Sequence, residues 1–79
     1  MNQFDTFDTD VCNRLIDLLI DLSLSDDYIK FIVGAAGNDE NRQEIVEYIE
    51  GKTKEGKIVD TNQLMRIAIY LGKNNNQSD

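Results

Sequence analysis

Hydrophobic residues recur along most of the chain at the three- and four-residue spacing of amphipathic helices. Together with the capping residues, this spacing predicts helices over residues 9–23, 25–36, 39–50 and 61–72. The segment 64–71 is rich in β-branched and aromatic residues and would also suit a strand, but Asp60 and Gln63 have the spacing of a capping box, which favours a helix. The predicted fold is all-α, a compact bundle of about four short helices.

The predicted helix ends depend on short polar side chains and glycines, because the chain contains no proline. Residues that suit an N-cap precede the four helices: Thr9 with its neighbours Asp8 and Asp10, then Ser25, then Asn38 or Asp39, and finally Asp60. Gly37, Gly51 and Gly72 follow three of the helices, and a glycine commonly ends a helix. We therefore expect a charged loop over 51–57, with a short hairpin through Ile58 and Val59 as an alternative. Residues 1–73 are expected to form one domain and residues 74–79 a flexible, disordered polar tail.

The first predicted helix is apolar around most of its circumference. Its polar residues Asn13, Asp17 and Asp21 are spaced four apart and form one narrow stripe. A helix of this kind must be covered on most sides. The first and fourth helices together carry more apolar residues than one short chain readily buries, which predicts a homodimer. The residues predicted at this interface are Leu15, Leu19, Leu22, Met65, Ile69 and Tyr70.

Composition narrows the class of protein. A chain of 79 residues has room for one small domain, and a hydrophobic fraction of 41% is too high for a disordered chain. No apolar run approaches the roughly 20 residues of a membrane span, and the acidic first ten residues do not resemble a signal peptide, so we expect a cytoplasmic protein without a membrane partner. The single cysteine, Cys12, cannot form a disulfide within one chain.

The absence of histidine removes the commonest general base and the commonest metal ligand. The carboxylates are explained more simply as helix caps and a solvated face than as a calcium site or an acid–base pair. We therefore expect no catalytic residue, no metal, no cofactor and no small-molecule substrate.

The charge is divided unevenly along the chain. Residues 1–50 contain twelve acids and three bases, and residues 51–79 contain three acids and five bases, so the net charge of −7 divides into −9 and +2. The acidic part fits either a solubilising face or a face that binds a basic partner, for instance as a decoy for nucleic acid.

Two segments have features of nucleic-acid binders. Gly34 to Gly37 is a G-x-x-G followed by acids, which is a poor environment for phosphate. The helices on either side of Gly37 have the spacing of a helix-turn-helix, but in the second of them only Asn41, Arg42 and Gln43 suit base recognition. The basic region 52–66 is the better candidate, through Lys52, Lys54, Lys57, Thr61, Asn62, Gln63 and Arg66.

Two hypotheses follow. The first is a small acidic protein-interaction module without catalysis, self-associating as a homodimer, of bacterial or phage type and with a regulatory or inhibitory role. The alternative is a helix-turn-helix-like transcriptional regulator that binds DNA through the basic 52–66 region.

Overall fold

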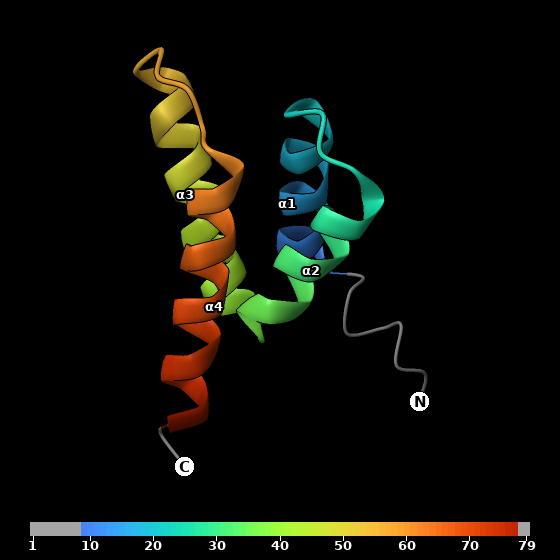
Figure 1. The fold of residues 1–79 in the computed structure, drawn as a ribbon, viewed down its shortest axis with the longest axis vertical. Helices are drawn as coiled ribbons and strands as arrows, with labels where there is room; N and C mark the ends of the chain where they lie inside the picture. The colour runs from blue at the N-terminus through green and yellow to red at the C-terminus, as the bar shows by residue number, and fades with distance from the viewer. Residues whose placement is uncertain (1–8, 78–79) are drawn as a thin grey trace.

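The computed structural model describes residues 9–77, which form four α-helices and no strand in that part of the chain. The helices are α1 (Asp10–Asp21), α2 (Asp26–Ala36), α3 (Asp39–Lys54) and α4 (Thr61–Gln77). Successive helices run in opposite directions (Figure 1). The all-α prediction is confirmed, and the segment 64–71 is helical.

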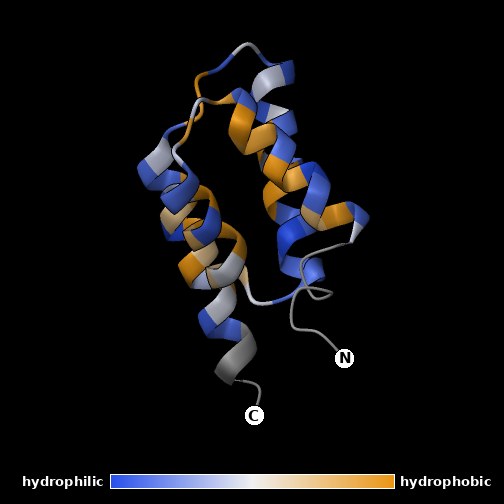
Figure 2. Ribbon diagram, turned by 90° about the vertical axis from the view of Figure 1, so that its right-hand side faces the viewer, coloured by the Kyte–Doolittle hydropathy of each residue, from blue (hydrophilic) through white to orange (hydrophobic). Residues whose placement is uncertain are grey.

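The core lies between two helix pairs that are distant in sequence. α2 packs most extensively on α4, and α1 packs on α3. Hydrophobic and hydrophilic residues alternate along the helices, as in amphipathic helices (Figure 2). The buried hydrophobic residues are Cys12, Leu15 and Leu19 of α1, Ile29, Ile32, Val33 and Ala36 of α2, Ile45, Val46 and Ile49 of α3, and Leu64 and Ala68 of α4.

The predicted N-caps are confirmed. The side chains of Thr9, Ser25 and Asn38 accept hydrogen bonds from backbone N–H groups three residues later, at 3.1, 3.5 and 2.8 Å. The Asp60 carboxylate accepts a hydrogen bond from the Asn62 N–H at 3.0 Å. Each cap satisfies a donor that the first helical turn leaves without an intrahelical partner, which is why the four helix starts were predictable.

Two of the predicted helix ends are wrong. α3 continues through Gly51 to Lys54, and the glycine in the left-handed region is Gly56, with φ +74°. The Gly56 and Lys57 N–H groups donate to the carbonyls of Thr53 and Lys52, which is the Schellman arrangement of a helix end. Residues 51–54 are therefore helical, and Ile58 and Val59 form no hairpin.

α4 likewise continues through Gly72 to Gln77, beyond its predicted end at residue 72. Gly72 is buried because α4 crosses the end of α2 at this point. A Cβ atom at position 72 would lie 2.0 Å from the carbonyl oxygen of Ala35 and 3.3 Å from its carbonyl carbon. The glycine is needed for close approach of two backbones, not for a turn.

We predict that Gly72→Ala destabilises the fold by about 1–3 kcal/mol, because the new methyl group meets backbone atoms that cannot rotate away. Gly51→Ala is the matched control, since it is also within a helix and a Cβ there meets nothing within 4 Å. That substitution should stabilise the fold by roughly 0.5–1 kcal/mol through helix propensity. Urea denaturation measures both changes, and a Gly72→Ala variant as stable as Gly51→Ala would contradict the close crossing.

Candidate functional site

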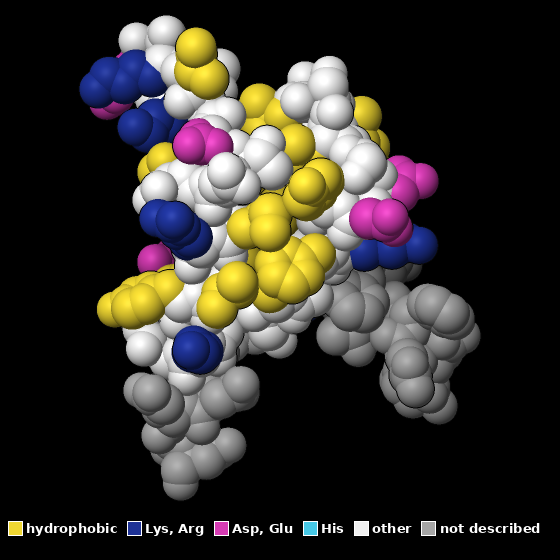
Figure 3. Space-filling model, viewed as in Figure 1, with side chains coloured by type: hydrophobic (Ala, Val, Ile, Leu, Met, Phe, Trp, Pro, Cys, Tyr) yellow, Lys and Arg dark blue, Asp and Glu magenta, His cyan; other side chains and the backbone are white. Residues whose placement is uncertain are grey.

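The most prominent surface feature is an exposed apolar strip where α2 lies beside α4, here called the α2–α4 seam. It consists of Tyr28 and Phe31 from α2 and Met65 and Ile69 from α4. Tyr28, Phe31 and Ile69 are 46%, 43% and 40% exposed, and Met65 is partly buried. Figure 3 shows hydrophobic side chains gathered across these two helices.

The seam contains a shallow groove of about 400 Å³. Its lining is formed by Ser25, Asp27, Tyr28, Phe31 and Met65. The Ser25 hydroxyl accepts the Tyr28 N–H as the cap of α2, so it is engaged in the fold. Asp27 is then the one carboxylate in the lining. The lining residues include no pair of a nucleophile and a base. The groove is suited to holding an apolar side chain of a partner.

Helical periodicity explains why these side chains are exposed. Phe31 lies two residues from Ile29 and two from Val33, which is about 200° around a helix from each of these buried residues. Met65 and Ile69 are four residues apart and therefore share one face of α4, beside the buried Leu64 and Ala68. The outward-facing Phe31 and the partly buried Met65 thus line one groove.

The two borders of the seam carry opposite charges. Asp27 lines the groove on the α2 border and lies in the acidic first turn of that helix. On α4, Arg66 follows Met65 and Lys73 lies four residues after Ile69, and both are exposed. Figure 3 shows several basic side chains over α4 and, on the other side of the hydrophobic strip, acidic side chains with a basic one next to them. Lys30 of α2 is also exposed, one turn after Asp27.

The predicted interface residues divide into two groups. Leu15 and Leu19 have no exposed surface, which places them in the core of the single chain because neighbouring helices cover α1. Leu22 is partly buried. Met65 and Ile69 lie in the seam, and Tyr70, 63% exposed, lies further around α4. Of the predicted interface residues, Ile69 and Tyr70 of α4 are therefore exposed, whereas Leu15 and Leu19 of α1 are not.

The predicted nucleic-acid contacts differ in exposure, and two acidic residues, Glu55 and Asp60, lie among them in sequence. Lys52 is partly buried, with its Nζ 5.5 Å from the centre of the Tyr48 ring, and Lys57 Nζ lies 3.4 Å from the Glu55 carboxylate. The Asp60 carboxylate is held at the start of α4. Thr61 is partly buried, whereas the remaining predicted contacts, Lys54, Asn62, Gln63 and Arg66, are exposed.

The three residues expected to read bases from the second helix of the helix-turn-helix are engaged within the fold. Asn41 and Arg42 are 7% and 2% exposed. Gln43 donates a hydrogen bond to Glu47 on the same helix at 3.1 Å. Asn41 and Arg42 are therefore turned into the fold, whereas Gln43 lies at the surface with its amide bonded to Glu47.

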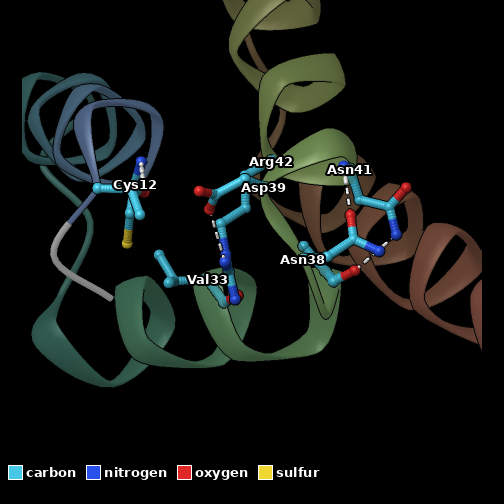
Figure 4. A network of polar contacts seen from close by, with 8 residues as sticks. Cys12, Val33, Asn38, Asp39, Asn41 and Arg42 are labelled. Atoms are coloured by element: carbon cyan, nitrogen blue, oxygen red, sulfur yellow. Dashed lines mark hydrogen bonds and ion pairs between the residues drawn. The ribbon is translucent and has the colours of Figure 1, made fainter. Parts of the chain in front are cut away.

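Asn41 and Arg42 join three helices at the end of α2 (Figure 4). The Asn41 side-chain amide donates to the Ala36 carbonyl at 2.7 Å and to the Leu71 carbonyl of α4 at 3.2 Å. Arg42 Nε donates to the Val33 carbonyl at 3.0 Å, and its guanidinium pairs with Asp39 at 2.8 Å. These contacts could not be predicted from local sequence patterns, because a polar residue near the start of a helix is usually solvated.

Neither a metal site nor a membrane segment is found in residues 9–77. No group of three or more cysteine, aspartate and glutamate side chains is arranged to hold an ion in this part of the chain. None of the described helices combines the length and the apolar character that crossing a bilayer requires. Comparison with protein family models, curated proteins and solved structures found no match to the chain. The function of the seam is therefore inferred from its own residues.

We predict that Asn41→Ala destabilises the fold by about 1–3 kcal/mol, because it removes the donor shared by the Ala36 and Leu71 carbonyls. Arg42→Met, which keeps most of the side-chain stem, should act in the same direction by removing the donor to Val33. Gln43→Ala is the control and should change stability by less than about 0.5 kcal/mol, because its only bond is on the surface. Thermal or urea unfolding would measure the three effects; equal effects of Asn41→Ala and Gln43→Ala would contradict this role.

Proposed function

We propose that the chain is a small, acidic, non-enzymatic protein-interaction module that self-associates through the α2–α4 seam, and that it acts in the cytoplasm as a regulatory or inhibitory protein of bacterial or phage type. The observation that carries this proposal is the exposure of Tyr28, Phe31 and Ile69 on one face. Phenylalanine, tyrosine and methionine are enriched in the buried centres of protein interfaces.

Energetics support an interaction role for this face. Burying apolar surface stabilises a protein by about 25 cal/mol per Å². A small domain therefore gains stability when a partner covers such surface. A single exposed hydrophobic residue is ordinary on a protein surface. Here four hydrophobic side chains from two helices lie together at or next to a groove. Burial of Phe31 against a partner would complete the coverage of α2, whose other side already forms the core.

The acidic outer face of α3 fits the same proposal. Glu40, Glu44 and Glu47 are exposed along this helix. Like charges of this density oppose non-specific association and keep the chain dispersed. Association is then favoured only where apolar surface outweighs the repulsion, which is the seam. The same carboxylates would also suit a basic partner for a regulatory complex.

We predict that Phe31→Ser weakens self-association by about thirty-fold or more, the effect of losing roughly 2 kcal/mol at a central aromatic contact. Ile20→Ser is the matched control, because Ile20 is an exposed hydrophobic residue on α1 outside the seam, 56% exposed. Sedimentation and light scattering across micromolar to millimolar concentrations measure the dissociation constants, and circular dichroism checks that both variants fold.

Two results would count against the proposal. A wild-type chain that is monomeric over the whole concentration range would remove self-association. An Ile20→Ser variant that weakens the dimer as much as Phe31→Ser does would show that the seam is not the contact surface.

DNA binding through the basic region is the second candidate. The observation in its favour is that Lys54, at the end of α3, and Gln63 and Arg66, near the start of α4, are all exposed. Against it stand the Glu55 and Asp60 carboxylates among the same residues, and the net charge of −7. Phosphate attraction supplies most non-specific affinity, so interleaved carboxylates reduce it directly.

We expect no retardation of duplex DNA by the wild-type chain in a mobility-shift titration at low salt, near roughly 50 mM. If the chain is a DNA-binding protein, it should instead bind duplex DNA, and this binding should weaken steeply as the salt concentration rises. It also requires that Lys54→Ala combined with Lys57→Ala abolishes the shift while Lys30→Ala, on α2, does not. Such a pattern would favour the DNA-binding alternative over the self-associating module.

A further inference from the structure

The charges beside the seam are placed so that one copy of the chain complements another. Where α2 lines the groove it carries the Asp27 carboxylate, with the exposed Lys30 one turn further along the helix and outside the lining, and the α4 border is basic through Arg66 and Lys73. Within the described residues, none of the side chains of Asp27, Arg66 and Lys73 forms a hydrogen bond or an ion pair with another part of the same chain. Their charges are therefore available to a partner on the same face.

A second copy can meet this face in two simple symmetric ways. In a face-to-face twofold dimer, the rotation axis lies in the plane of contact. An axis running along the seam exchanges the two borders, so the α4 border of one copy meets the α2 border of the other. An axis running across the seam leaves each border opposite its own copy, which puts acids against acids and bases against bases. Charge favours the first arrangement.

Resting on the proposed self-association, we propose that the partner of the seam is a second copy of this chain, related by a twofold axis along the seam, with Asp27 of each copy facing Arg66 of the other. The same rotation places Phe31 of one copy over Met65 and Ile69 of its partner. Thioether–aromatic contacts of this kind are favourable. The interface is then apolar at its centre and carries two equivalent ion pairs at its rim.

The test uses charge reversal on each border. In a dimer of Asp27→Lys chains, both rim pairs become lysine against arginine; in a dimer of Arg66→Glu chains, both become carboxylate against carboxylate. We expect each variant alone to dimerise on the order of tenfold more weakly than the wild type. In an equimolar mixture of the two, every rim pair is again of opposite sign, so the mixed dimer should recover wild-type affinity. Asp27→Lys with Arg66→Glu in one chain should recover it too.

Asp26→Lys is the matched control for Asp27→Lys. Both acids lie in the first turn of α2, so both substitutions have the same effect on net charge and on the helix dipole. Asp26 lies about 100° around the helix from Asp27 and is not part of the groove, so its reversal should leave the dimer intact. Asp27→Lys also reduces the net charge of −7 in magnitude, so general repulsion alone predicts tighter association, not weaker.

Sedimentation equilibrium on each variant, and native mass spectrometry on the mixture, distinguish the outcomes. Recovery in the mixture and in the double variant supports the proposed axis. A wild-type dimer that depends on Phe31, combined with no recovery in the mixture, would overturn this axis and leave the proposed self-association standing. A strictly monomeric wild-type chain, as expected if a different protein occupies the seam, would overturn both.

Discussion

The structure depends on how the carboxyl end of α2 is satisfied. The last four carbonyls of a helix lack intrahelical partners, and α2 has no basic residue of its own in its last turn. Arg42 and Asn41 of α3 donate to the carbonyls of Val33 and Ala36, and a positive charge is favourable at this negative end of the helix dipole. Because Asn41 also donates to the Leu71 carbonyl, the same residue joins α4 to this corner.

This corner determines where the candidate interaction surface lies. Gly72 allows the backbone of α4 to touch that of α2 at Ala35, next to the carbonyl that Asn41 holds. With the carboxyl end of α2 fixed on α4 in this way, the outward-facing Phe31, one turn earlier, remains beside Met65. The seam is thus a consequence of polar contacts in the interior, although its own residues are apolar. A loss of these interior contacts would disturb the two borders together.

The sequence indicated the fold more completely than the surface. Caps such as Ser25 and Asn38 act on the nearest N–H groups, so a local pattern is enough to find them. Gly51 and Gly72 were predicted as helix ends because a glycine that ends a helix cannot be told, in one sequence, from a glycine inside a helix such as Gly72, which allows two helices to touch. Hydrophobicity alone does not show that Leu15 and Leu19 are buried and Phe31 is exposed. The exposure of each side chain depends on which neighbouring helix covers it. The rotation of about 200° around the helix from Ile29 to Phe31 indicates that Phe31 points away from the core.

The division of apolar residues between the helix pairs explains why the exposed surface is on α2 and α4. α1 is apolar around most of its circumference, and α3 and α2 both contact it, which covers Cys12, Leu15 and Leu19 and leaves Ile20 exposed. α2 has 11 residues and a core-facing stripe of Ile29, Ile32, Val33 and Ala36, so Phe31 adds nothing to the core of the monomer. A phenylalanine in that position leaves apolar area in water that a polar residue would not. Its presence is accounted for physically if the outer face of α2 is covered by a partner.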